Sequence, residues 1–267
     1  MEKPVSALLG PFDPPAFEIF NAQGGNAQGG GPWLIVCDHA SHAVPLALSE
    51  LGLEMAELRR HIGWDIGAAA VARRLAARLD APAVLSGYSR LVVDCNRAPD
   101  DPTSIATISD GVKVPGNAEI SAEARAARLD ACFHSYHGAI ASIVQGLREK
   151  GIEPVLFSIH SFTPVMNGSA RPWHVGVLWD NDPRLPVPLM AALRALNKDL
   201  VVGDNQPYSA RAPAGYTLRR HAEAAGFRHA LVELRQDLVD TPEGAEEWAE
   251  ILDAALKSAL NRPLDTY

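Results

Sequence analysis

The sequence predicts an α/β protein with a mostly parallel, mixed central sheet and helices on both faces. Short apolar runs that fit buried strands alternate with longer segments in which apolar residues recur at helical spacing. Several apolar runs lead directly into polar side chains, as strands do where they leave a sheet. The length agrees with this class, because 267 residues suffice for one α/β domain with a sizeable core.

The chain begins with an arm rich in proline and glycine, residues 1–32. This arm contains a duplicated Asn-Ala-Gln-Gly-Gly within residues 21–31. Such a composition has little power to form a core, so we expect the arm to be flexible. From residue 33 to residue 267 no linker divides the chain, and we expect a single domain there.

The predicted strands are short and rich in Val, Leu and Ile. We expect them at 33–38, 82–86, 90–95, 154–159, 174–179, 199–202 and 229–234. The predicted helices lie between them, at 65–79, 121–150, 187–197, 216–225 and 243–261. Ser121 is expected to cap the longest of these helices. Breaker residues make loops of 98–117, 162–172 and 203–209.

Composition excludes several classes of function. A net charge of −8 argues against nucleic acid or an anionic membrane as partner, and no apolar run is long enough to span a bilayer. The first residues, Met-Glu-Lys-Pro, lack the pattern of a signal peptide. Three widely spaced cysteines, Cys37, Cys95 and Cys132, do not suggest a disulfide framework, so we expect a cytoplasmic protein. The oligomeric state is not determined, and a homo-oligomer stays open.

Two histidines stand at or just beyond the ends of predicted strands. His39 follows Leu34-Ile-Val-Cys-Asp, and His160 follows Val155-Leu-Phe-Ser-Ile. One such histidine alone is readily explained by a hydrogen bond to the backbone. Two of them favour a shared ligand site, because open α/β sheets bind ligands beyond the carboxyl ends of their strands. Two imidazoles, one carboxylate and an open position make up a catalytic zinc site.

Three residues compete for the place of the third metal ligand. Asp65 begins a predicted helix, where the helix dipole favours a carboxylate even without a metal. His42 lies three residues after His39. Asp38 is adjacent to His39, but neighbouring side chains of a strand point to opposite faces. We prefer Asp65 and leave His42 and Asp38 open.

Glu233 lies within the predicted buried strand Ala230-Leu-Val-Glu-Leu. A buried carboxylate is costly unless it is paired or functional. A general base that acts on water at a metal would explain it. The alternative is an ion pair with Arg235 or another arginine.

Arg90, Asn96 and Arg97 lie at the two ends of one predicted strand, 90–95. Two guanidinium groups and an amide are suited to hold a carboxylate with several hydrogen bonds. The alternative is ion pairing with Asp94, Asp100 or Asp101. In a protein of net charge −8, a basic pocket for an acidic substrate is the interpretation that we prefer.

Ordered matches over residues 33 to 240 resemble the N-formylglutamate amidohydrolase family. They are Cys37-Asp-His-Ala-Ser-His-Ala-Val-Pro45, Gly63-Trp-Asp-Ile-Gly-Ala68, Ser89-Arg-Leu-Val-Val-Asp-Cys-Asn-Arg97, Ser158-Ile-His-Ser-Phe-Thr-Pro164, Arg171-Pro-Trp-His-Val-Gly-Val-Leu178, Gly203-Asp-Asn-Gln-Pro-Tyr-Ser209, Tyr216-Thr-Leu-Arg-Arg-His221 and Val232-Glu-Leu-Arg-Gln-Asp-Leu238. The resemblance implies a three-layer fold similar to that of the zinc exopeptidases. It also implies metal-dependent hydrolysis of a small anionic N-acyl amino acid, N-formyl-L-glutamate or a relative, with one divalent ion, preferably Zn²⁺.

The resemblance also implies roles for individual residues. His39 and His160 match metal ligands, and Glu233 matches the catalytic acid–base residue of related zinc amidases. The segment Val93-Asp-Cys-Asn-Arg97 matches the segment that holds the substrate carboxylate. Carboxypeptidases of this group have Glu three residues after the first histidine, where this chain has His42. Related amidases place the acid at the start of the next helix, which matches Asp65. A zinc peptidase or cell-wall amidase, and a non-catalytic small-molecule binding protein, remain the alternatives.

Overall fold

The computed structural model describes residues 8–22, 31–211 and 215–260. Residues 1–7 and 23–30 of the predicted arm, which include most of the duplicated Asn-Ala-Gln-Gly-Gly, lie outside the described residues. No helix in the described part of the chain is both long and apolar enough to cross a membrane.

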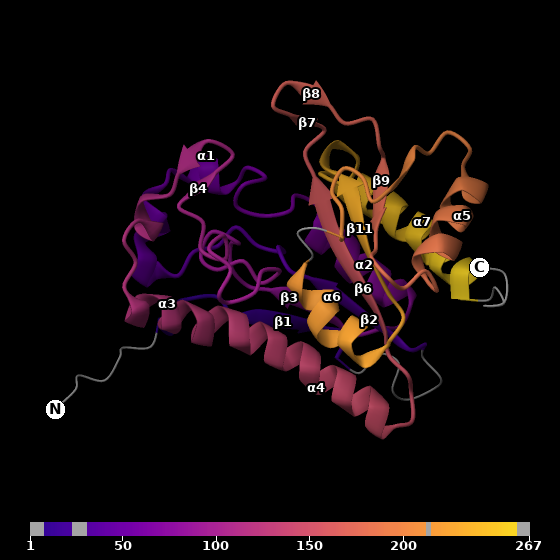
Figure 1. Ribbon diagram of the computed structural model, residues 1–267, viewed down its shortest axis with the longest axis horizontal. Coiled ribbons are helices and arrows are strands. Elements are labelled where there is room, and N and C mark those ends of the chain that lie inside the picture. Colours follow the sequence, from indigo (N-terminus) through magenta and orange to yellow (C-terminus); the bar gives the residue numbers. More distant parts are fainter. Residues whose placement is uncertain (1–7, 23–30, 212–214, 261–267) are drawn as a thin grey trace.

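The described residues form a seven-stranded mixed sheet with the strand order β1-β3-β2-β6-β11-β9-β10 (Figure 1). The strands are β1 (Phe17–Phe20), β2 (Trp33–Cys37), β3 (Ala83–Ser86), β6 (Val155–Phe162), β9 (Val175–Leu178), β10 (Val202–Asp204) and β11 (His229–Arg235). Strands β3, β2, β6 and β11 run parallel to one another. Strand β1 is antiparallel to β3, and β9 is antiparallel to β11. The predicted mostly parallel sheet is confirmed, and four carboxyl ends meet at one edge of it.

Helices cover both faces of the sheet, as predicted. They are α1 (Met55–Leu58), α2 (Ala68–Arg78), α3 (Ala122–Arg128), α4 (Ser135–Glu149), α5 (Pro186–Leu196), α6 (Tyr216–His221) and α7 (Pro242–Leu260). Shorter helical segments are η1 (Leu46–Gly52), η2 (Pro115–Asn117), η3 (Leu129–His134), η4 (Glu223–Ala225) and η5 (Gln236–Leu238). Helices α2, α5 and α7 bury their apolar sides in one core cluster, and α4 and α6 lie against the other face.

Alternation along the strands determines which side chains reach the site. In β6, Phe157 and Ile159 belong to the core under α2, α5 and α7, so His160 points to the face covered by α4 and α6. In β11, Val232 and Leu234 belong to the same core, and Glu233 therefore shares the face of His160. The two strands are adjacent, and Glu233 is the register partner of His160.

The predicted strand at 90–95 is wrong. Residues 91–97 form a series of turns, with Val92 N donating to Ser89 O (2.9 Å) and Arg97 N donating to Asp94 O (3.2 Å). Leu91, Val92 and Val93 are buried, but in a separate apolar cluster with η1, α1 and η3. A short apolar run indicates burial without deciding between a strand and a packed loop.

Other differences are smaller. Strand β1 lies within the predicted arm and pairs at the sheet edge, which the sequence analysis missed. The helix predicted from residue 65 begins at Ala68, after Gly67 with φ 80°, so Asp65 lies in the turn before it. Ser121 caps α3 as predicted, since its hydroxyl accepts from Ala124 N at 3.2 Å. Two hairpins, β4 (Ile108–Ser109) with β5 (Val112–Lys113) and β7 (Val165–Met166) with β8 (Ser169–Ala170), lie within predicted loops.

Candidate metal centre and active site

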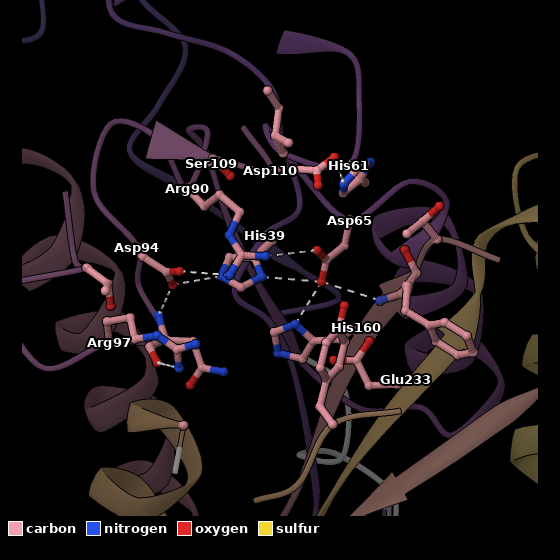
Figure 2. Close-up of a pocket in the computed structure, with 18 of the residues that line it drawn as sticks. His39, His61, Asp65, Arg90, Asp94, Arg97, Ser109, Asp110, His160 and Glu233 are labelled. Atoms are coloured by element: carbon pink, nitrogen blue, oxygen red, sulfur yellow. Dashed lines mark hydrogen bonds and ion pairs between the residues drawn. The ribbon is translucent and has the colours of Figure 1, made fainter. Parts of the chain in front are cut away.

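A cavity of about 820 Å³ lies at the carboxyl ends of β2, β6 and β11. All seven residues predicted from the sequence line it, although they come from five separate segments. These residues are His39, Asp65, Arg90, Asn96, Arg97, His160 and Glu233, and Figure 2 labels all of them except Asn96. The metal-ligand, base and clamp candidates therefore converge on one cavity, although Asp65 and the three clamp residues come from turns and not from strand ends.

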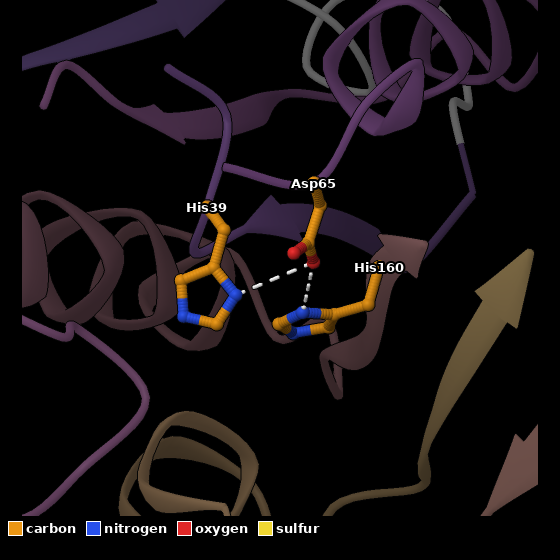
Figure 3. A group of neighbouring side chains, drawn as sticks. All are labelled: His39, Asp65 and His160. Atoms are coloured by element: carbon orange, nitrogen blue, oxygen red, sulfur yellow. Dashed lines mark hydrogen bonds and ion pairs between the residues drawn. The ribbon is translucent and has the colours of Figure 1, made fainter. Parts of the chain in front are cut away.

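His39, Asp65 and His160 form a buried cluster in the lining of this cavity, and Figure 3 shows their side chains pointing toward one another. His39 Nδ1 lies 3.3 Å and His160 Nδ1 lies 2.7 Å from the same atom, Asp65 Oδ2. One ligand atom from each of the three residues falls within 4.8 Å of the others. The loop after β2 is tied to the turn before α2, because Asp65 N donates to His39 O at 3.0 Å.

The two other candidates for the third ligand lie elsewhere. His42 packs on the ring of Trp64, with ring centroids 5.0 Å apart, and does not belong to the cluster among the described residues. Asp38 lies on the far side of His160, where its Oδ2 is 3.0 Å from His160 Nε2. The structure thus brings Asp65, and neither alternative, to the Nδ1 atoms of both histidines.

Each histidine of the cluster has a second carboxylate behind it. His39 Nε2 lies 2.8 Å from Asp94 Oδ1, and His160 Nε2 contacts Asp38 as described. When Nε2 carries the proton and donates it to the carboxylate, the Nδ1 lone pair is free for a metal. This carboxylate–histidine–metal arrangement orients ligands in many metal sites. The residues present therefore fit one divalent cation between His39, Asp65 and His160.

The charges of the cluster agree with that fit. Burial alone would raise the pKa of Asp65, but His39 and His160 outweigh it and hold this pKa below its usual range. Burial alone would lower the pKa of His160, but Asp38 and Asp65 raise it well above its usual value. The carboxylates of Asp38 and Asp65 thus favour positive charge at the position between His39, Asp65 and His160. One divalent ion bound to neutral imidazoles supplies the same charge as two imidazolium protons.

Glu233 stands beside this cluster as a buried carboxylate that lacks a full set of partners. The residue is 7% exposed, and its Oε2 makes no hydrogen bond within the described part of the chain. Burial and the charge of Asp65 raise the pKa of Glu233 to about 7, against the opposing effect of His160, His39 and Arg90. The alternative of an ion pair with Arg235 does not hold, because Arg235 pairs with Asp237 at 2.8 Å.

The three candidates for the carboxylate clamp differ in what already holds them. Arg90 Nη2 lies 2.9 Å from Asp94 Oδ2, and Nη1 lies 3.6 Å from Asp65 Oδ1. Asn96 Oδ1 accepts a hydrogen bond from Thr217 N at 3.1 Å, which leaves its Nδ2 as a donor. Arg97 donates only to a backbone carbonyl, Asn96 O at 3.4 Å, among the described residues. Arg97 and Asn96 are therefore more available to a ligand than Arg90.

Sequence reasoning missed the residues that support the ligands. The sequence analysis gives Asp38 only as an alternative third metal ligand, and Asp94 only as an alternative ion-pair partner of Arg90 or Arg97. Thr217, whose hydroxyl donates to Asp38 Oδ1 at 2.6 Å, and Tyr136, which donates to the same oxygen at 2.9 Å, were not considered at all. A carboxylate next to a ligand histidine is a usable signal for Asp38. No local signal exists for contacts across 98 or 179 residues.

Comparison with known proteins gives a family and a fold. The family model described as N-formylglutamate amidohydrolase matches residues 31–239. A gene product from Agrobacterium tumefaciens of known crystal structure is 34% identical with a TM-score of 0.89, covering 95% of this chain and 98% of that chain. N-formylglutamate amidohydrolase from Ralstonia eutropha JMP134 is 17% identical with a TM-score of 0.65, covering 91% of this chain and 97% of that chain. No protein matches in the comparison with curated proteins.

Proposed function

The chain belongs to the N-formylglutamate amidohydrolase family, a family of amidohydrolases, and on this premise we propose a substrate and a mechanism. The proposed reaction is metal-dependent hydrolysis of the amide bond of a small N-acyl amino acid, N-formyl-L-glutamate or a related compound. The observation that carries it is a buried His39–Asp65–His160 cluster beside the buried, incompletely partnered carboxylate of Glu233 in one cavity. The products are a carboxylate and a free amino acid.

His39, Asp65 and His160 would hold one divalent cation, with Zn²⁺ the preferred identity for two imidazoles and a carboxylate. Such a cation polarises a carbonyl and lowers the pKa of a nearby water. Asp94 and Asp38 keep the two imidazoles in the tautomer and orientation that ligation needs, through contacts of 2.8 and 3.0 Å.

Glu233 would act as the general base and then as the general acid. Its carboxylate takes a proton from the attacking water and delivers it to the nitrogen of the leaving amino acid. The pKa of about 7 suits both steps, because a group that exchanges protons near neutral pH can serve as base and as acid. The register pairing of Glu233 with His160 keeps the base next to the proposed ligand.

Arg97 and Asn96 would bind the carboxylate of the substrate. The guanidinium of Arg97 and Nδ2 of Asn96 are hydrogen-bond donors at the cavity wall. Binding of the substrate carboxylate to these donors would orient the scissile amide toward the metal side of the site. Arg90, paired with Asp94 and close to Asp65, would contribute positive charge near the reacting carbonyl. We also propose that residues 33–267, with β1 (Phe17–Phe20) added to their sheet, act as one amidohydrolase domain in the cytoplasm, with neither nucleic acid nor membrane as partner.

Elemental analysis joined to a hydrolysis screen tests the proposal. Purified protein should contain one equivalent of metal and release amino acids from N-formyl and other N-acyl amino acids. His160→Ala should lose both, while His134→Ala, a change at an exposed histidine, should keep both. Full activity after metal removal would refute the metal-dependent mechanism. Cleavage of peptides without cleavage of N-acyl amino acids would favour a zinc peptidase.

A further inference from the structure

One arginine beside the cavity has only uncharged partners. The guanidinium of Arg171 donates to the hydroxyl of Tyr208 at 2.9 Å and to Thr163 O at 3.5 Å. It also lies 4.9 Å from the ring centre of Tyr208 and 5.7 Å from that of Phe162. In the described part of the chain no carboxylate lies within 4.0 Å of this guanidinium. Its positive charge is therefore left for another group to balance.

Arg171 lies directly behind the cavity wall. Tyr208, Phe162 and Thr163, which it contacts, all line the cavity, whereas Arg171 itself does not. Phe162 follows His160 by two residues in β6 and shares its face of the sheet, so this part of the wall adjoins the proposed metal site. A group in the cavity would therefore interact with Arg171 through the hydroxyl of Tyr208.

The hydroxyl of Tyr208 carries a proton that it can donate into the cavity. Its oxygen accepts the hydrogen bond from Arg171, and among the described residues the hydroxyl donates to no acceptor. Acceptance from a cation makes a hydroxyl a stronger donor, because linked hydrogen bonds polarise one another. Burial and the charge of Glu233 raise the pKa of Tyr208 above its usual value, against the opposing effect of Arg171. The hydroxyl thus stays protonated near neutral pH.

A second guanidinium without a carboxylate partner, that of Arg97, lies on the other side of the proposed metal site. Figure 2 shows Arg97 and Glu233 on opposite sides of His39 and His160. Tyr208 belongs to the Glu233 side, since no other charge raises its pKa as much as that of Glu233. The cavity thus has donors on both sides of the proposed metal ligands, which suits a substrate with two carboxylates.

We propose that Tyr208, with Arg171 behind it, binds the side-chain carboxylate of an N-acyl glutamate and so selects acidic amino acids. This inference rests on the proposed function and assigns the carboxylate at Arg97 and Asn96 as the α-carboxylate. The hydroxyl of Tyr208 donates to the second carboxylate, and the charge of Arg171 offsets the repulsion from Glu233. Tyr208 touches the substrate, whereas Arg171 is a positioning residue that acts through Tyr208.

The test compares N-formyl-L-glutamate with N-formyl-L-methionine, which has an uncharged side chain of similar length. The native protein should have a kcat/KM at least roughly ten-fold higher for the glutamate compound. Tyr208→Phe keeps the ring that stacks on Arg171 but removes the hydroxyl, and Arg171→Met removes the charge. Each variant should lower kcat/KM for the glutamate compound roughly ten-fold or more, mainly through KM, and that for the methionine compound by less than about three-fold.

Arg148→Met is the matched control. Arg148 also stacks on an aromatic ring, that of Phe227 at 5.8 Å, but it does not line the cavity. This variant should keep both kcat/KM values within about two-fold of those of the native protein. Equal losses for the two compounds in Tyr208→Phe and Arg171→Met would overturn the inference, because a merely structural role lowers both alike. A native protein without a preference for the glutamate compound would overturn it as well.

Binding separates this inference from the proposed reaction. Release of formate from neither compound would reject the proposed function. Calorimetry with N-formyl-L-glutamate would then still decide the inference. Binding to the native protein that weakens roughly ten-fold in Arg171→Met and stays unchanged in Arg148→Met supports it. Any other pattern, including no binding to the native protein, overturns it.

Discussion

Glu233→Gln should stabilise the metal-stripped protein at high pH and strongly reduce the activity of the metal-loaded enzyme. Glu233 is 7% exposed, and burial raises the pKa of its carboxyl from 4.5 to about 7. A shift of this size corresponds to about 3 kcal/mol of unfavourable free energy for the ionised form in the folded state. Because the folded state binds the proton more tightly than the unfolded state does, the stability from Glu233 is complete below pH 4.5 and is lost as the pH rises through 7.

Urea denaturation followed by circular dichroism, on protein dialysed against a chelator, measures this effect. The variant should be about 3 kcal/mol more stable than the native protein near pH 8.5, and within about 1 kcal/mol of it near pH 5. Glu247→Gln, at an exposed position of α7, should change stability by less than about 0.5 kcal/mol at both pH values. A gain for Glu233→Gln that does not depend on pH, or a loss at pH 8.5, would refute the reasoning. Activity of the metal-loaded variant should fall by roughly 10²- to 10⁴-fold.

Three further predictions follow from single contacts. Asp94→Asn leaves Nε2 of His39 without its charged partner and should weaken metal binding roughly 10- to 100-fold in chelator competition; unchanged affinity would contradict this role. Arg97→Met should raise KM for N-acyl amino acids by roughly 10- to 100-fold, and a change confined to kcat would contradict a binding role. Gly67→Ala should destabilise the protein by about 2–3 kcal/mol in thermal denaturation, because φ is 80° and the new Cβ would come within 2.2 Å of Val239 O. Gly138→Ala, on the open side of α4, is its control and should be neutral or stabilising.

The elements that could be predicted from the sequence are those whose structure depends on residues close to them in the chain. Strand β2 is a continuous apolar run and β6 begins with one, and both strands are fully buried; such runs are typical of parallel strands in α/β proteins. His39, which follows β2, and His160, which lies near the end of β6, could therefore be placed at one edge of the sheet. Glu233 could be identified because a carboxylate within an apolar run has a high cost.

The parts that sequence reasoning missed depend on tertiary contacts. Residues 91–93 are as apolar as a strand, but they bury themselves against η1, α1 and η3 instead of pairing in the sheet. Strand β1 is only partly buried and forms because β3 offers it an edge, so its burial pattern is weak. Asp94 could be identified as polar and buried, but whether it holds His39, Arg90 or both depends on a contact across 55 residues.

The start of α6 joins the metal side of the site to the carboxylate clamp. Thr217 N donates to Asn96 Oδ1 at 3.1 Å, and the hydroxyl of the same residue donates to Asp38 Oδ1 at 2.6 Å. Asp38 in turn holds His160, so one buried residue supports both a proposed ligand and a proposed substrate donor. Asn96 O also accepts from Tyr216 N at 3.1 Å, which leaves little freedom for this segment to shift alone. A displacement of α6 would therefore move Asn96 of the proposed clamp together with Asp38, which holds the proposed ligand His160. The distance between the clamp, which binds the substrate carboxylate, and the metal side of the site, where the scissile amide reacts, would then be kept.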